Sequence, residues 1–153
     1  MPRNLSLALI MITAVAGVAT LPAQALASVN QLTEARAAVR AISETALNEM
    51  RSFYEIQTAQ GVLSQLDRGV VRSTVRRLKI RFADLCDSVE ARADASMSMN
   101  TPFICVSDLK LAEFPSEIVP TVFSSLLVRE AARALSLSDA EAVSLQSLSR
   151  GTL

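Results

Sequence analysis

The feature that most constrains the fold is a stripe of apolar residues, spaced mostly three or four positions apart, over residues 30–66. This spacing places them on one face of an α-helix, which turns once every ~3.6 residues. The sequence therefore predicts one long amphipathic helix over 30–66, with a bend at Gly61. We expect Asp67-Arg68-Gly69 to be the turn that ends this helix. The stripe consists of Leu32, Ala35, Val39, Ile42, Ala46, Met50, Phe53 and, after a gap, Leu63 and Leu66.

Residues 70–92 carry two competing patterns. Apolar and basic residues alternate over Leu78-Lys79-Ile80-Arg81-Phe82, as they do in a β-strand. Helical steps connect a larger set of apolar residues, so we expect a second helix. Two long helices joined by a short turn predict an antiparallel helical hairpin over 28–92. The helical set is Val71, Val75, Leu78, Phe82, Leu85 and Val89.

A connector is expected over 93–116, after the hairpin. Residues 93–102 are small and polar and predict a loop, whereas Phe103-Ile104-Cys105-Val106 predicts a short strand or a buried extended segment. Ser107 or Asp108 is suited to cap a short helix that runs to Phe114, before Pro115 interrupts the chain.

A buried helix is predicted over about 117–136, because this stretch is apolar on most sides until Arg129. Pro120 is tolerated in its first turn. Ser138 and Glu141 have the spacing of a capping box, in which each side chain bonds the other residue's backbone N–H. A final helix is therefore expected over about 139–149. The predicted fold is mainly α, with the hairpin packed on this C-terminal helix pair over 117–153.

The N-terminus has the pattern of a secretory signal peptide. A basic start at Arg3 precedes an uncharged, apolar run from Leu5 to Leu21, and Ala25-Leu26-Ala27 has small residues where signal peptidase needs them. We predict cleavage after Ala27 and a periplasmic or secreted protein of residues 28–153. The alternative is an uncleaved anchor, since the run approaches the ~20 residues of a membrane span. After cleavage no stable membrane anchor is expected.

Composition narrows the chemistry further. The chain has 15 basic and 15 acidic residues, and its overall charge gives no argument for binding nucleic acid or a membrane. Its two cysteines, Cys86 and Cys105, are expected to form a disulfide in an oxidising compartment; two buried free thiols are the alternative. There is no histidine, so neither Ser-His-Asp nor Cys-His machinery can be assembled.

The second helical segment carries a basic cluster, which allows two interpretations. It is either an anion-binding surface, for lipid head groups or an acidic partner, or a solvated helix face paired with acids of the first helix. No aromatic residues are interleaved to stack bases, so nucleic acid is not expected. The cluster consists of Arg68, Arg72, Arg76, Arg77, Lys79 and Arg81.

A resemblance to zincin-type metallopeptidases covers about residues 103–149. Zincins carry His-Glu-x-x-His on a helix, and this chain has Arg129-Glu130-Ala131-Ala132-Arg133 in that register. Ala134-Leu135-Ser136-Leu137 resembles the Ala-Leu-Gly-Leu that often ends the zincin helix. Asp139-Ala140-Glu141-Ala142 resembles the acidic segment that supplies some zincins with a third ligand. Ile104-Cys105-Val106-Ser107 resembles the segment that leads into the metal helix of small exported peptidase-like proteins.

The departures from the zincin pattern decide the expected chemistry. Arginines stand at both histidine positions, and a guanidinium has no lone pair with which to bind zinc. The resemblance leaves Glu130 at the general-base position and Glu141 or Asp139 at the third-ligand position. We therefore expect no metal and no cofactor. Instead we expect an ion-pair cluster, in which Arg129 and Arg133 bind these carboxylates and join the last two helices. The degenerate site candidates are Arg129, Glu130, Arg133 and Glu141.

Three functions are compatible with this sequence. The first is an exported, non-catalytic zincin-like pseudopeptidase that acts by binding a protein partner. The second is a helical periplasmic interaction or assembly protein unrelated to peptidases, whose 30–66 stripe packs against a partner. The third is a metal-dependent hydrolase with a residual carboxylate site at Glu130.

Overall fold

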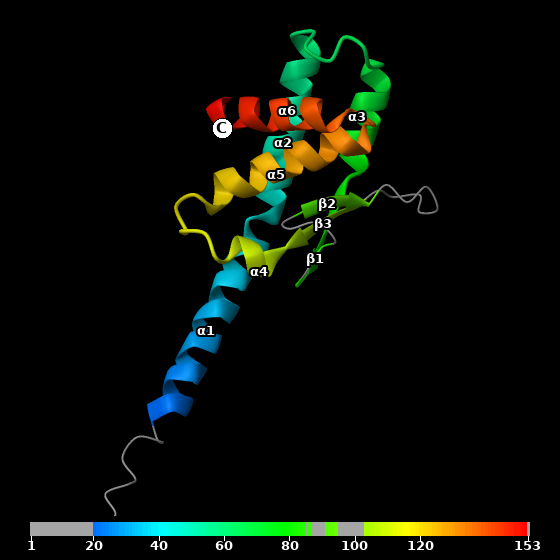
Figure 1. Cartoon of the computed structure of the whole chain (residues 1–153). Helices are drawn as coiled ribbons and strands as arrows, with labels where there is room; N and C mark the ends of the chain where they lie inside the picture. Colours follow the sequence, from blue (N-terminus) through cyan, green and yellow to red (C-terminus); the bar gives the residue numbers. More distant parts are fainter. Residues whose placement is uncertain (1–19, 85, 87–90, 95–102, 153) are drawn as a thin grey trace, which may run out of the picture. The chain divides into compact units, whose positions relative to one another are not determined.

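The computed structural model describes residues 20–84, 86, 91–94 and 103–152 (Figure 1). The chain divides into two units, residues 1–31 and 32–153. Helix α1 (Thr20–Ala41) begins in the first unit and ends in the second. In the described residues, no helix combines the length and the hydropathy that a bilayer crossing requires. Most of the predicted leader, residues 1–19, lies outside the described residues, and its cleavage stays a prediction.

The predicted single helix over 30–66 is two helices, so that prediction was wrong in its extent. A turn at Ile42 separates α1 from α2 (Ser43–Ala59), and α2 ends well before Leu66. Gly61 does not bend the helix but terminates it, with a left-handed φ of 79°. Gly61 N–H donates to the Thr58 carbonyl and Val62 N–H to the Gln57 carbonyl, which is the Schellman arrangement that glycine favours.

The predicted helical hairpin is present, but its second helix is shorter than predicted. This helix begins at Arg68, within the segment Asp67-Arg68-Gly69 that was predicted to be a turn. Helix α3 spans Arg68–Arg77, and the Asp67 side chain caps it by accepting from Val70 N–H at 3.0 Å. Asp67 therefore begins α3 rather than ending the preceding helix. Figure 1 shows α2 and α3 running side by side after the connecting turn, and they pack together.

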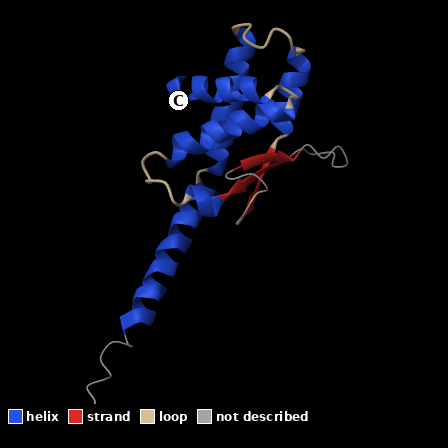
Figure 2. Cartoon of the chain, in the orientation of Figure 1, coloured by secondary structure: helices blue, strands red, loops and turns tan. Residues whose placement is uncertain are grey.

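The prediction of a helix over 70–92 was wrong beyond Arg77. The chain becomes extended at Leu78, where ψ is 133°. The alternating residues form strand β1 (Lys79–Ala83), which pairs in parallel with β3 (Phe103–Ser107). Strand β2 (Ala91–Asp94) pairs with β3 in antiparallel fashion, giving the order β1-β3-β2 (Figure 2). Pairing with a distant segment decides this conformation. Residues 93–94 of the predicted loop thus belong to β2, and 95–102 lie outside the described residues.

The C-terminal part follows the prediction closely. The extended segment at 103–106 is β3, and Ser107 caps α4 (Asp108–Leu111) by accepting from Lys110 N–H at 3.1 Å. The predicted end of this helix at Phe114 was wrong, because Glu113 and Phe114 N–H donate to carbonyls three residues back, as in a turn. Helix α5 spans Val119–Ala134 with Pro120 in its first turn, and α6 spans Asp139–Thr152.

Helix α5 lies at the centre of the second unit. It packs against α2, α4, α6, β2 and β3, and most of its residues are buried. Tyr54 of α2 is also buried and donates from its hydroxyl to the Val128 carbonyl of α5 at 2.8 Å. Ser124 of α5 donates to the Glu49 carboxylate of α2. These bonds fix α2 along α5 and satisfy polar groups that burial would otherwise leave unpaired.

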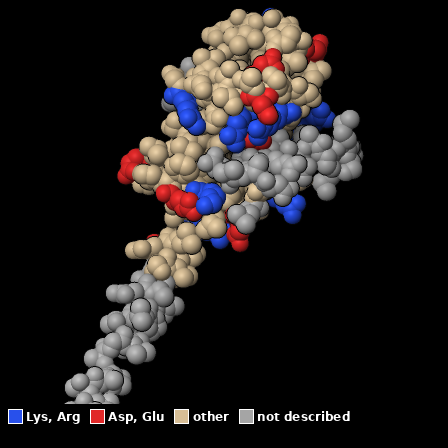
Figure 3. Space-filling model, viewed as in Figure 1, with Lys and Arg blue, Asp and Glu red and all other residues tan. Residues whose placement is uncertain are grey.

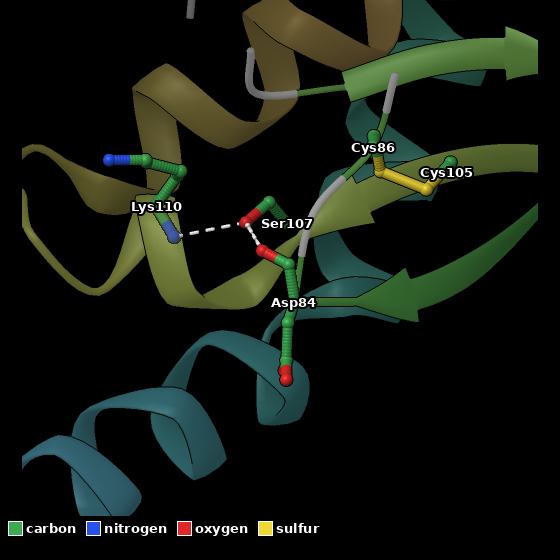
Figure 4. The surroundings of a disulfide bond; sticks show 5 residues. All are labelled: Asp84, Cys86, Cys105, Ser107 and Lys110. Atoms are coloured by element: carbon green, nitrogen blue, oxygen red, sulfur yellow. Dashed lines mark hydrogen bonds between the residues drawn. A yellow bond between two sulfur atoms is a disulfide. The ribbon is translucent and has the colours of Figure 1, made fainter. Parts of the chain in front are cut away.

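The predicted disulfide is confirmed: Cys86 and Cys105 are bonded, 19 residues apart in sequence (Figure 4). It ties the chain after β1 to the middle of β3. Beside it, the Ser107 hydroxyl donates to the Asp84 carbonyl at 2.7 Å while it also caps α4 (Figure 4). The disulfide and the hydrogen bond to Asp84 therefore tie β3 to the segment that follows β1, in addition to the pairing of β3 with β1.

Reducing the Cys86–Cys105 disulfide is expected to lower the free energy of unfolding by about 3 kcal/mol, because the unfolded chain then regains the entropy of an open loop. Thermal unfolding with and without reductant measures this. The Cys86→Ser/Cys105→Ser variant should melt at the same lowered temperature under both conditions. Equal melting of the unmodified chain with and without reductant would contradict the prediction.

Candidate functional site

Glu130, the residue at the predicted general-base position, is buried in the centre of the fold. Its residue exposure is 0%, and it projects from α5 at a point where that helix also buries Ala131 and Ala132. A carboxylate in such surroundings is stable as an anion only when cations and hydrogen-bond donors compensate for lost water.

Both predicted arginines supply that compensation. Arg129 Nε lies 2.9 Å and Arg133 Nη1 lies 2.8 Å from the same oxygen, Oε1 of Glu130. The arginine side chains are 19% and 34% exposed, so each keeps contact with water while Glu130 does not. The expected pairing of Glu130 with Arg133 is therefore confirmed, and Arg129 joins it.

Arg133 also connects α5 to α6, as expected. Its Nε donates to Oδ1 of Asp139 at 3.0 Å, although Asp139 is largely exposed. One guanidinium thus binds a buried carboxylate with one nitrogen and a surface carboxylate with another, which suits its planar fork of donors.

Glu141 has a different role from the one that the site prediction gave it. Its Oε2 accepts from Ser138 N–H at 2.8 Å and from the Ser138 hydroxyl at 2.6 Å. Glu141 N–H in turn donates to the Ser138 hydroxyl at 3.3 Å, which completes the predicted capping box. These bonds from Ser138 hold the pKa of Glu141 below its ordinary value. Glu141 therefore starts α6, and Asp139 is the α6 acid that meets Arg133.

The cluster has the chemistry of a structural ion pair. Glu130 is out of reach of solvent and one of its oxygens is bound by two guanidinium groups, so its carboxylate is not accessible for contact with a substrate in this structure. Across the described part of the chain, no three acidic or cysteine side chains come together in a way that could hold a metal ion.

A second buried carboxylate, missed by the sequence analysis, lies at the start of α4. Asp108 has an exposure of 0% and is bound by two arginines of α1: Arg36 Nη2 at 2.9 Å, and Arg40 through Nε. Arg36 also pairs with Asp84, which follows β1. Two hydrogen bonds raise the pKa of Arg36: the one to Asp108 has the larger effect, and the one to Asp84 the smaller. The four-residue spacing of Arg36 and Arg40 indicates that both lie on one face of a helix. It does not identify Asp108 as their partner, because Asp108 lies in a distant segment.

The predicted basic cluster splits into two groups. Arg68, Arg72 and Arg76 line a cavity between α2 and α3, whereas the other members are exposed outside it. Glu55 of α2 lies 3.4 Å from Arg76 and 3.9 Å from Arg72, so pairing with an acid of the first helix is confirmed for these two. On the face drawn in Figure 3, basic and acidic side chains lie beside each other.

Comparison with protein-family models, with curated proteins and with solved structures finds no match for this chain.

Replacing Glu130 with Gln is expected to lower the free energy of unfolding by about 3 kcal/mol, because it leaves two partly buried guanidinium groups without their anion. Asp139→Asn is the matched control on the other side of Arg133; it should cost less than about 1 kcal/mol, since Asp139 is exposed. Chemical denaturation of both variants measures the difference. Equal, small losses would show that Glu130 is not the anchor of the cluster.

The Glu141 cap predicts a pH dependence. A carboxylate whose pKa is lowered by folding stabilises the fold above its unfolded pKa, and this contribution disappears as the pH falls through the folded pKa. The melting temperature of Glu141→Gln should therefore lie furthest below that of the unmodified chain near neutral pH. The gap should narrow in acid below the ordinary pKa of a glutamate. A gap of constant size from neutral pH into acid would contradict this role for the charge.

Proposed function

We propose that this protein is an exported, non-catalytic zincin-like pseudopeptidase that acts by binding a protein partner. The observation that carries the proposal is the geometry around Glu130. The two arginines at the zincin histidine positions both bind the glutamate that a peptidase would use as its base. In this proposal their positive charges take the electrostatic role of the metal.

Two further features near Glu130 support the zincin-like interpretation, one of the backbone and one of the side chains. Ser136, which stands where the resembling segment has Gly, has a left-handed φ of 61°, a conformation that glycine adopts most easily. Asp139 on the following helix meets Arg133, as a third ligand from that helix would meet a metal. Export is proposed from the predicted leader over 1–27, and the disulfide is compatible with an oxidising compartment.

The residual-hydrolase alternative has less support. A general base needs hydrogen-bond contact with its substrate or with an attacking water. Glu130 is fully buried and already accepts from Arg129 and Arg133, so a substrate would have to displace both arginines to reach it.

Restoring the two imidazoles tests this proposal. The Arg129→His/Arg133→His variant should bind zinc, with Asp139 in reach as a third ligand. Zinc at 100 times its Kd should then stabilise the variant by about 2.7 kcal/mol, read as a rise in melting temperature that a chelator reverses. The unmodified chain should show no response to zinc or chelator and no hydrolysis of an unfolded protein substrate.

The matched control is Arg129→Gln/Arg133→Gln, which removes the same charges without adding ligands and should not respond to zinc. If the histidine variant does not fold, the same substitutions combined with Glu130→Gln remove the uncompensated buried charge. If the histidine variant folds but does not respond to zinc, the proposal that residues 129–133 correspond to the zincin motif is overturned. A zinc-dependent activity of the unmodified chain would overturn the non-catalytic proposal.

A helical assembly protein is the second candidate. Most of the predicted 30–66 stripe cannot supply its interface, because Val39, Ala46, Met50, Phe53 and Leu63 are buried in the chain's own core. Other apolar side chains, on the surface of the second unit, favour this candidate. A groove of about 690 Å³ runs along α2 to Leu148 of α6, and Ile56, Val62 and Leu148 are exposed at it. Exposed apolar groups that gather at a groove are typical of protein interfaces.

The assembly candidate predicts that the chain oligomerises with rising concentration. Light scattering after size exclusion should then show a mass that increases with concentration, and Ile56→Ser should shift it toward the monomer. Val70→Ser, an exposed apolar position that does not line this groove, is the control and should leave the mass unchanged. A monomer at every concentration would count against this candidate.

A further inference from the structure

A cavity lies between α2 and α3, outside the ion-pair cluster at Glu130. It has a volume of about 360 Å³, within the ~300–1,000 Å³ of small-molecule sites. It lies in the helical hairpin and shares no lining residue with the Glu130 cluster. Its charged lining residues are Arg51, Glu55, Arg68, Arg72 and Arg76.

The charge of this cavity is strongly positive. Four arginines face one glutamate, and Arg68, Arg72 and Arg76 follow one another at four-residue steps, which places them on one face of α3. Glu55 lies within 4 Å of Arg72 and Arg76 alone among these arginines. Arg51 and Arg68 form no ion pair with any acid in the described part of the chain, so the cavity keeps positive charge that an anion can neutralise.

Arg51 has an unsatisfied donor. Its Nη1 donates to Asn48 Oδ1 at 3.1 Å and its Nη2 to the Leu78 carbonyl at 3.5 Å. Its Nε is buried and has no hydrogen-bond partner among the residues that the structure describes. This atom is closed to solvent, so what Arg51 contributes to the cavity is the positive charge of its guanidinium group rather than a free donor.

The rest of the cavity is apolar. Most of the surface that the cavity presents is apolar, and Ala59 is exposed at its wall beside the backbone of Gly69. Tyr54, Val71 and Val75, each at most 3% exposed, form a closed floor beneath it. An inorganic anion would bind the arginines but leave this apolar surface unfilled. A ligand with an aliphatic body and an anionic end satisfies both kinds of wall.

We propose that the cavity between α2 and α3 binds a single amphipathic anion, a carboxylate or phosphate carried on an aliphatic chain. The arginines bind the head group through charge-assisted hydrogen bonds, and the chain lies over Tyr54, Val71 and Val75. This inference does not depend on the zincin-like frame, because α5 and α6 contribute no residue to the cavity.

Calorimetric titration with decanoate, decyl phosphate and 1-decanol, each below the concentration at which it aggregates, tests the inference on the full chain. Both anions should bind, and the alcohol, which has the same chain without the charge, should bind at least about tenfold more weakly. The Arg68→Gln/Arg76→Gln variant changes two exposed side chains and should fold. It should weaken both anions by about tenfold or more without affecting the alcohol. Arg51→Gln should also weaken the anions.

Arg77→Gln is the matched control, because Arg77 belongs to α3, bonds the Ser73 carbonyl at 3.1 Å and does not line the cavity. It should leave all three affinities unchanged. The inference is overturned if neither anion binds, or if Arg68→Gln/Arg76→Gln and Arg77→Gln behave alike. It is also overturned if phosphatidylglycerol vesicles or an acidic peptide bind through these arginines while the two monomeric anions do not.

Discussion

The second unit depends on compensating two carboxylates that it buries completely. Glu130 belongs to α5, the helix against which the sheet and the neighbouring helices pack, and Asp108 starts α4 beside β3. Among the residues that the structure describes, two arginines bind each of them, and these guanidinium groups lie nearer the surface than the acids. Removing these arginines would leave charges in the interior at a cost of several kcal/mol per ion. Ion pairs therefore join Arg36 and Arg40 of α1 to α4, and Arg133 of α5 to Asp139 of α6, in addition to apolar packing.

The same compensation is the basis of the functional proposal. A frame that resembles a zincin helix has cations of its own at the positions where histidines would bind a metal. In the proposal, the arginines balance the charge of Glu130 in place of a metal ion, but they cannot bind zinc themselves. The proposed ligand cavity at α2 and α3 is separate from this cluster, so binding there would leave the ion pairs intact.

Local signals in the sequence predicted local structure well. The capping box of Ser138 and Glu141, the Ser107 cap, the buried helix around Pro120 and the cysteine pair each depend on residues close in sequence or on the pairing of two thiols. The sequence-based predictions failed where contacts between segments far apart in the sequence determine the conformation. Nothing near Ile80 shows that β3 will pair with it, and nothing near Arg36 shows that Asp108 will. The cluster at Glu130 could be predicted because its members are spaced along α5 and the start of α6.

The central claim is that Glu130 and Arg133 stabilise the fold as a coupled pair. A double-mutant cycle of Glu130→Gln and Arg133→Gln, followed by chemical denaturation, tests it most directly. We predict that the two losses are not additive, with a coupling of more than about 1 kcal/mol, because the contact between Glu130 and Arg133 can be lost only once. Arg129 still binds Glu130 in the Arg133→Gln variant, and Asp139 still binds Arg133 in the Glu130→Gln variant. Additive losses, within about 0.5 kcal/mol, would contradict the account.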